Sequence, residues 1–339
     1  MRSFLLRFVL LLAASYGLLY FSYKFYQPAF VQHRDFLGSY YWMFQNPLDF
    51  TQAAAPFIYR QISALLTYAL FAAGIYYPSE TAFADAAYDP RIFFAALATN
   101  YLGLVSAAAL AGEIVKRETG GFVFPLLAGL LTVLSFHVQS VVITGLTEGI
   151  TWLFVAALYL LYARESRVAF AGLLVLAIFQ RELIPVVFGL IAGAAFVIGH
   201  GSRRYNLFVL ATAIACFALY LVMRFAVIGV TGQEAQLMPF IAPMLEGAIT
   251  WDLVVPVLVS QNVMMIAITV GAARWLKQGR VPRELFVLLI ACAVLGVLGL
   301  GSNMGTNIGR LVGVLTPVFA ALIARDLFRL EVRRVGSGE

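Results

Sequence analysis

Charged residues are scarce in this chain, and this scarcity decides its class. Of 339 residues, 12% are charged and 62% are hydrophobic, and the mean hydropathy is +0.89. A soluble globular domain does not have this composition, so the sequence indicates an integral membrane protein. No polar stretch is long enough for a separate soluble domain. We therefore expect a single transmembrane domain over residues 1–339, with a cytoplasmic tail at 329–339.

Cysteines, metal-ligand patterns and nucleotide-binding motifs are also lacking. The only two cysteines, Cys216 and Cys292, lie in apolar segments, so we expect no disulfide framework. The three histidines and the carboxylates show no metal-ligand spacing. A Mg²⁺ or Mn²⁺ ion held by Asp35 or Glu148 together with a substrate phosphate stays an alternative. No Gly-rich phosphate loop is present, which argues against a nucleotide substrate. In a membrane protein Lys and Arg gather in cytoplasmic loops, so the net charge of +6 does not indicate nucleic-acid binding.

The apolar runs predict an all-α fold, a polytopic membrane helical bundle of about 10–11 transmembrane segments. A crossing needs about 20 apolar residues. The first run has no small-x-small cleavage site, so we expect a retained helix and not a signal peptide. The runs are 4–22, 57–76, 92–115, 122–138, 141–162, 169–199, 206–230, 251–273, 285–303 and 308–328.

One run, 169–199, is too long for a single crossing. It is interrupted by Gln180-Arg181-Glu182, and Pro185 follows. Ionisable residues are costly at membrane depth. We therefore predict two short helices that meet near one membrane face.

Basic residues gather in five clusters that set the expected topology. All five are expected to be cytoplasmic, and Arg2 and Arg7 favour a cytoplasmic N-terminus, which places the loop 23–56 outside. The run 57–76 then cannot be one simple crossing. Either it enters and leaves on the same face, or an extra crossing is hidden, or the charge rule fails there. The clusters are Lys116/Arg117, Arg164/Arg167, Arg203/Arg204, Arg274/Lys277/Arg280/Arg283 and Arg325/Arg329/Arg333/Arg334.

Two carboxylates are candidates for chemistry. Asp35, in the external loop, is either a general base for an acceptor hydroxyl or an ordinary loop carboxylate paired with Arg34. Glu148 lies inside an apolar run, about two turns from its outer end, and needs a partner such as Arg181 or His137. It is either functional or half of a buried structural pair. His137 alone is typical of a residue satisfied by hydrogen bonds.

Three arginines lie near the outer ends of apolar runs, namely Arg60, Arg224 and Arg310. A guanidinium is a planar fork that suits phosphate oxygens, so the three together favour a lipid-phosphate site. The alternative for each is snorkelling towards headgroups. The adjacent Arg181 and Glu182 form either a structural ion pair or a corner where a broken helix binds substrate.

Several short motifs resemble the GT-C class of polytopic glycosyltransferases, which includes bacterial relatives of the dolichyl-phosphate mannose and arabinose transferases. They are Pro56-Phe57-Ile58-Tyr59-Arg60, Thr147-Glu148, Phe179-Gln180-Arg181-Glu182-Leu183, and Gly309-Arg310-Leu311 before Pro317. The resemblance implies a catalytic carboxylate in the first external loop, which matches Asp35, and a second acid, which matches Glu148. It also implies that Arg60, Arg181, Arg224 and Arg310 hold a lipid-phosphate donor. We add Glu182 and His137 as candidate substrate-binding residues. Many members have paired acids in the first external loop, whereas this chain has a single Asp with a distant Asp49. It also lacks the soluble C-terminal domain that some members carry.

Three functions remain open at this point. The first is a transferase of the bacterial inner membrane that moves a sugar from a polyprenyl phosphate to an acceptor glycan or lipid. The second is a transporter or flippase for a lipid-linked or small anionic substrate, which the interrupted run 169–199 also fits. The third is a non-catalytic membrane subunit of surface-polysaccharide assembly. Asp35 distinguishes them, because only the transferase needs a base.

Overall fold

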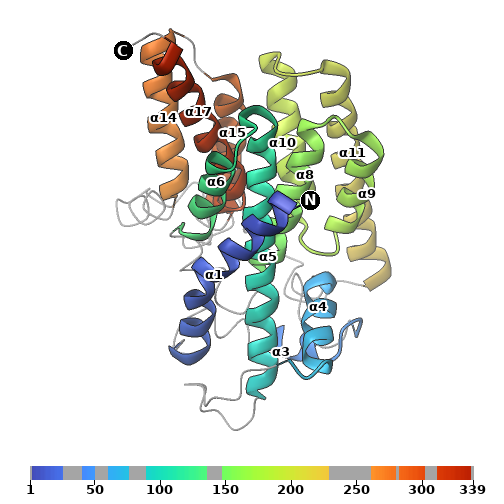
Figure 1. Cartoon of the computed structure of the whole chain (residues 1–339). Helices are drawn as coiled ribbons and strands as arrows, with labels where there is room; N and C mark the ends of the chain where they lie inside the picture. Colours follow the sequence, from blue (N-terminus) through green and yellow to red (C-terminus); the bar gives the residue numbers. More distant parts are fainter. Residues whose placement is uncertain are drawn as a thin grey trace.

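Every regular element in the part of the chain that the structure describes is a helix (Figure 1). The structure is a computed structural model, and it describes residues 2–25, 40–49, 60–75, 89–135, 147–228, 261–279, 282–301 and 311–336. The expected all-α class is therefore confirmed.

The long helix α5 (Pro90–Thr119) is the central element of the fold (Figure 1). Its 30 residues span about 45 Å, and most of its side chains are buried. The side chain of Asp89 caps its start by accepting the backbone N–H of Arg91, and Gly120, with a φ of 65°, ends it. Alanine and glycine recur along α5, and such small residues allow neighbouring helices to approach closely.

Helix α1 (Arg2–Phe25) packs along α5 in the opposite direction. Near its start the buried Arg7 forms an ion pair with Glu113, towards the end of α5. Near its end Tyr23 stacks on Phe93, at the beginning of α5, with ring centroids 6.4 Å apart. The first helix therefore begins at the end of the bundle where α5 finishes.

Some of the remaining helices pack against α5, and the others pack on these (Figure 1). Helix α8 and helix α6 make the most extensive contacts with it, and α17 packs against both α5 and α6. The other helices are α3 (Tyr41–Gln45), α4 (Gln61–Ala72), α6 (Val123–Val133), α8 (Glu148–Ala163), α9 (Arg167–Ala177), α10 (Leu183–Ile198), α11 (Arg203–Val222), its continuation η4 (Met223–Ile228), α14 (Asn262–Gln278), α15 (Arg283–Gly301) and α17 (Thr316–Gly336).

The interruption predicted in the run 169–199 is present. Helix α9 ends at Ala177 and α10 begins at Leu183, with turns between them. Pro185 is the third residue of α10, where its missing N–H breaks no helical hydrogen bond. The prediction of two short helices is therefore confirmed.

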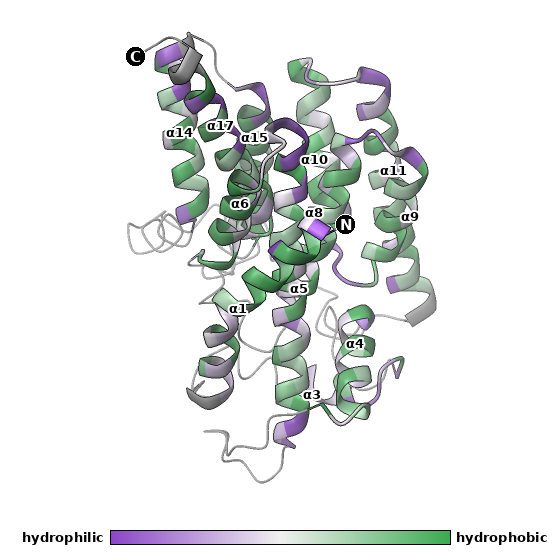
Figure 2. Cartoon of the chain, in the orientation of Figure 1, coloured by the Kyte–Doolittle hydropathy of each residue, from purple (hydrophilic) through white to green (hydrophobic). Residues whose placement is uncertain are grey.

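The described members of the five basic clusters lie at one end of the bundle, and Arg280 lies outside the described residues. Arg117 donates to the carbonyl of Ala163 at 3.4 Å, which brings the first cluster to the second. Arg167 lies over the ring of Phe208, in the first turns of α11. Figure 2 shows these helix ends as hydrophilic, at the top of the view. Ion pairs connect the remaining clusters: Glu118, next to the first cluster, pairs with Arg325 and Arg329 of the fifth. Arg274 of the fourth cluster pairs with Asp326, next to Arg325. The common placement that the charge pattern predicted is thus found.

Helix α4 does not cross from one end of the bundle to the other. Its first turn lies at the α9–α10 connection, where Ile62 N donates to Phe179 O at 3.2 Å. Its last turn lies near the start of α5, where Arg91 sits over the ring of Phe71. With 12 residues it is about 18 Å long, too short for a crossing. The structure describes residues 60–75 of the run 57–76. Their arrangement fits the alternative in which the run enters and leaves on the same face of the membrane.

Three helices in the described part of the chain are long and apolar enough to cross a membrane, namely Arg2–Tyr23, Pro90–Thr119 and Arg203–Ala226. Five further apolar helices, α4, α6, α8, α9 and α10, have 11 to 16 residues. The described residues therefore contain fewer candidate spans than the sequence led us to expect for the whole chain. The reason is that hydropathy measures the length of an apolar run and not the length of the continuous helix within it.

Candidate functional site

A cluster of buried charged side chains lies where several helix ends meet. Arg60 precedes α4, Glu148 begins α8, and Arg181 lies in the α9–α10 connection. These three residues are 5%, 2% and 6% exposed, respectively. Burying charges is costly unless they are paired, so each of these residues needs an oppositely charged partner.

Two ion pairs run across the cluster. Arg181 Nη1 lies 3.3 Å from Glu148 Oε1, so the partner expected for Glu148 is confirmed. Arg60 Nη2 lies 3.8 Å from Glu182 Oε1. The guanidinium of Arg60 also donates to the hydroxyl of the buried Tyr40. The structure thus brings together four of the residues that the sequence singled out, in two pairs that join α4 and α8 to the α9–α10 connection.

Glu148 is the first residue of α8, rather than lying two turns inside a helix as we had expected. Its Oε2 accepts the backbone N–H of Thr147 at 3.0 Å. A negative charge at a helix start interacts favourably with the positive end of the helix dipole. This local stabilisation explains why a buried carboxylate is tolerated at the start of a helix.

Gln180, which we did not predict as a site residue, connects the elements of the cluster. It is fully buried, and its Nε2 donates to Thr147 O at 2.9 Å and to Thr151 Oγ1 at 3.2 Å. Its Oε1 accepts a hydrogen bond from Ser63 Oγ of α4 at 2.9 Å. One side chain therefore ties α4 and the start of α8 to the connection that carries Arg181. The signal in the sequence was an amide next to two charges inside an apolar run.

The crossing of α5 and α8 fixes the position of Glu148. Asn100 Oδ1 of α5 accepts the backbone N–H of Gly149 at 2.9 Å. A Cβ atom at Gly103 would come within 2.6 Å of the carbonyl carbon of Gly149, so only glycine fits at this crossing. Close backbone approach at small residues is a recurrent way of packing helices in membranes.

The other candidate residues are less informative. Arg224 lies in η4, where its Nη1 is 3.5 Å from the hydroxyl of Tyr220 and its guanidinium lies near the ring of Phe225. Asp35, His137 and Arg310 lie outside the described residues. Within the described residues, no group of three or more His, Cys, Asp and Glu side chains could hold a metal ion.

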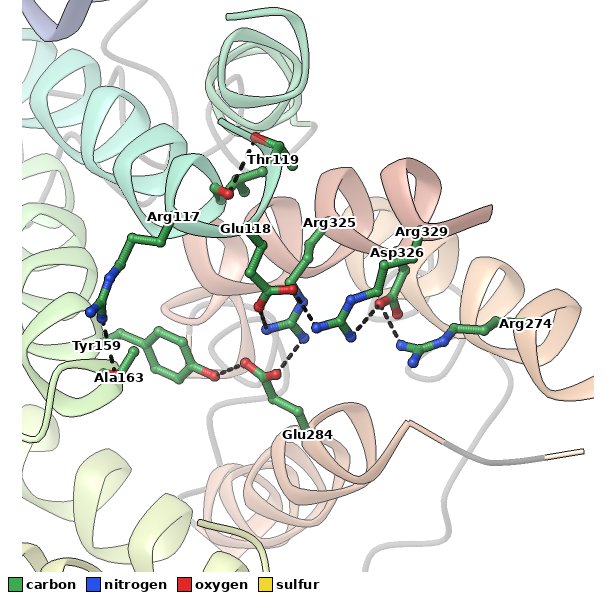
Figure 3. A network of polar contacts seen from close by, with 11 residues as sticks. Arg117, Glu118, Thr119, Tyr159, Ala163, Arg274, Glu284, Arg325, Asp326 and Arg329 are labelled. Atoms are coloured by element: carbon green, nitrogen blue, oxygen red, sulfur yellow. Dashed lines mark hydrogen bonds and ion pairs between the residues drawn. The ribbon is translucent and has the colours of Figure 1, made fainter. Parts of the chain in front are cut away.

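A second ionic network occupies the basic end of the bundle (Figure 3). Arg325 of α17 pairs with Glu118 of α5 at 3.4 Å and with Glu284 of α15. Tyr159 of α8 donates to Glu284 at 2.5 Å. Further along α17, Asp326 pairs with Arg274 of α14 at 2.7 Å and with Arg329 at 3.7 Å. The network joins five helices, and its acids were missed although each directly follows an arginine in the sequence.

Glu284, the second residue of α15, is held in its charged form by this network. Burial alone would raise the pKa of Glu284, but the Arg325 guanidinium and the hydrogen bond from Tyr159 outweigh it and lower the pKa. At the opposite end of the bundle, hydrogen bonds from Arg91 lower the pKa of Asp89, against the opposing effect of its burial. Both carboxylates are therefore ionised at neutral pH.

Comparison with known proteins gives no relative on which to base a function. No protein-family model matches the chain, and neither a curated protein nor a solved structure matches it significantly.

Proposed function

We propose that the protein is a multi-pass enzyme of the bacterial inner membrane that transfers a sugar from a polyprenyl phosphate to an acceptor glycan or lipid. The observation that carries this proposal is the convergence of two buried arginines, Arg60 and Arg181, at one cluster. Guanidinium groups bind phosphate oxygens through paired N–H donors. A lipid phosphate that enters between the arginines and their glutamates would exchange one anionic partner for another.

The depth of the cluster supports a lipid substrate. Helix α8 runs 16 residues from Glu148 to Ala163, at the basic end, which is about 24 Å. The hydrocarbon core of a bilayer is about 30 Å thick. With the basic end at the cytoplasmic boundary, the arginines lie just inside the outer boundary. A prenyl chain can then stay in the hydrocarbon while its phosphate reaches them.

In this proposal Asp35 is the general base. It precedes Tyr40 by five residues, a separation that a polypeptide chain spans with at most about 18 Å. Tyr40 accepts a hydrogen bond from Arg60, so the loop that carries Asp35 is joined to the cluster. Asp35 takes the proton of an acceptor hydroxyl, and the oxygen attacks the anomeric carbon. The bond from that carbon to the phosphate oxygen breaks, and the lipid phosphate leaves with the electron pair.

The arginines act on the leaving group. Negative charge builds up on the phosphate as the glycosidic bond breaks, and preorganised cations stabilise that charge in a site from which water is excluded. A single displacement at the anomeric carbon inverts its configuration. Arg60 and Arg181 thus bind the donor and also assist its departure.

A transporter of lipid-linked substrates is the second candidate. The break between α9 and α10 favours it, because non-helical backbone at membrane depth lines binding sites in transporters. A transporter, however, has no need of a base at Asp35.

Deletion and complementation in the host tests the proposal. Wild type, Asp35→Asn and the matched control Asp49→Asn from the same loop are expressed at equal levels. Polyprenyl-phosphate sugars are then measured by mass spectrometry of lipid extracts, alongside surface glycans. We expect a lipid-linked sugar to accumulate and a glycan decoration to vanish with Asp35→Asn, as in the deletion, but not with Asp49→Asn. If Asp35→Asn complements fully while the deletion has a phenotype, the transferase proposal is wrong.

A further inference from the structure

A patch of exposed arginines at the basic end of the bundle differs from the network of Figure 3. It consists of Arg164 and Arg167, at the α8–α9 connection, and Arg203 and Arg204, at the start of α11. We call these four residues the α9–α11 patch. All four are exposed, and none forms an ion pair with a carboxylate in the described part of the chain. In the network, by contrast, Arg325, Arg329 and Arg274 all pair with carboxylates.

The members of the patch are held together by contacts beneath them. Tyr205 OH of α11 donates to Leu161 O of α8 at 3.4 Å, and Tyr162 OH donates to Asn206 Oδ1 at 2.7 Å. Arg167 lies over the ring of Phe208. The two connections therefore face the same side of the molecule, on an aromatic base.

The charge of the patch is not neutralised by its neighbours. Glu165 is the only acid between residues 164 and 167, and none occurs between residues 199 and 204. Arg167 and Arg203 are the first residues of their helices, and neither helix has an acid in its first turn. Cations at the positive end of a helix dipole are locally unfavourable, so these arginines reduce the stability of the free protein. An external anion would relieve this repulsion.

The surroundings of the patch indicate which anion. Val168, next to Arg167, is 88% exposed, and Val197, at the end of α10, is 83% exposed. Leu207, one turn after Arg203, is also exposed. Exposed arginines beside exposed aliphatic side chains match a lipid with an anionic headgroup and acyl chains, whereas a soluble anion would have no use for the aliphatic surface.

We propose that the α9–α11 patch binds anionic phospholipid headgroups of the membrane leaflet at the basic end of the bundle. The headgroup phosphate contacts the arginines of the two connections, and the acyl chains lie along the aliphatic residues of α9, α10 and α11. This binding is independent of any sugar transfer at the other end of the molecule.

The test uses the full chain in detergent micelles, titrated with phosphatidylglycerol or phosphatidylcholine of equal chain length and followed by native mass spectrometry. We expect wild type to retain phosphatidylglycerol preferentially. Arg203→Gln with Arg204→Gln is expected to weaken this retention by about tenfold or more, since each basic residue near an anionic surface contributes about fivefold. Arg203→Lys with Arg204→Lys keeps the charge and is expected to retain most of the binding.

The matched control is Lys277→Gln with Arg283→Gln, which removes two exposed charges from the same end of the bundle. We expect it to change retention by less than about twofold. Equal losses in the two double variants would show that general charge attracts the lipid, and the proposal would be wrong. Equal retention of the two lipids by wild type would also contradict it. So would competition by soluble glycerol 3-phosphate at the concentration of the lipid, which would indicate a site for a free anion.

Discussion

Gly149 of α8 and Asn100 of α5 are in direct contact at the point where the two helices cross. A methyl group added to Gly149 would lie 2.0 Å from the carbonyl oxygen of Asn100, while the Asn100 side chain accepts the Gly149 N–H at 2.9 Å. No side chain fits between the two backbones. Because Glu148 directly precedes Gly149, this contact sets the place at which its carboxylate meets Arg181.

Gly149→Ala is therefore expected to destabilise the protein. The neighbouring atoms belong to the backbone of α5 and cannot move aside cheaply, so we expect a loss of about 1–3 kcal/mol in the free energy of unfolding. Thermal unfolding in detergent measures this. The control is Gly172→Ala in α9, where an added methyl group meets nothing within 4 Å. Alanine is the better helix former, so the control is expected to stabilise by about 0.5–1 kcal/mol. Equal effects of the two substitutions would contradict this account of the crossing.

The pair Glu148–Arg181 separates stability from function. Glu148→Gln or Arg181→Gln alone leaves one buried charge without its ion-pair partner, and we expect each to cost about 3–5 kcal/mol. The double variant Glu148→Gln/Arg181→Met removes both charges and is expected to recover most of that loss. Unfolding midpoints are measured on the purified variants in detergent, and polyprenyl-phosphate sugars in lipid extracts of the host that expresses them. A stable double variant without transfer activity is the outcome expected for a substrate site, whereas a stable and active one would show that the pair is only structural.

The parts of the site that the sequence predicted correctly are those whose signal is local. Charged residues inside an apolar run, followed by Pro185, were sufficient to predict the break between α9 and α10. The common location of the basic clusters followed from the charge distribution alone. The pairing of Arg60 with Glu182 could not be predicted, because it depends on how α4 docks against the α9–α10 connection, far away in the sequence.

Helix α4 shows why hydropathy was misleading. Its run has the composition of a transmembrane segment, yet the helix has 12 residues and packs beside the first part of α5. An apolar residue can face lipid or another helix, and hydropathy does not distinguish the two. The acids of the basic end were missed for a similar reason. Glu118, Glu284 and Asp326 each follow an arginine, but each has a partner on another helix.

Gln180 offers a test of how the cluster is assembled. Gln180→Met keeps the volume but removes three hydrogen bonds. Thr147 O still accepts from the backbone N–H and the hydroxyl of Thr151, whereas the buried Ser63 Oγ loses this acceptor. An unsatisfied buried polar group costs about 1–3 kcal/mol, so we expect a loss of about this size in the free energy of unfolding. Ser63→Ala alone is expected to cost about 1 kcal/mol. The double variant is expected to lose less stability than the sum of the two single losses, because both substitutions remove the same hydrogen bond. Strict additivity in thermal unfolding would exclude the bond between Ser63 and Gln180.

The network at the basic end gives a prediction for acid pH. The folded-state pKa of Glu284 is lowered below its ordinary value of 4.5, so the unfolded state binds a proton more readily than the folded state. The stabilisation from Glu284 is therefore fully present above about pH 5. It is lost as the pH falls through the ordinary value towards the folded-state pKa. We expect the unfolding midpoint of wild type to drop over this range.

Substituting Glu284 tests the origin of that drop. Glu284→Gln leaves Arg325 without one of its two carboxylate partners, so we expect a lower unfolding midpoint at pH 7 and a smaller further decrease on acidification. Glu165→Gln is the control, because Glu165 is exposed and forms no ion pair in the described part of the chain. It is expected to follow the wild-type profile. If Glu284→Gln and wild type lose the same stability between pH 6 and pH 3, the acid sensitivity comes from other carboxylates. Arg325 and Tyr159 would then not be holding Glu284 in its charged form.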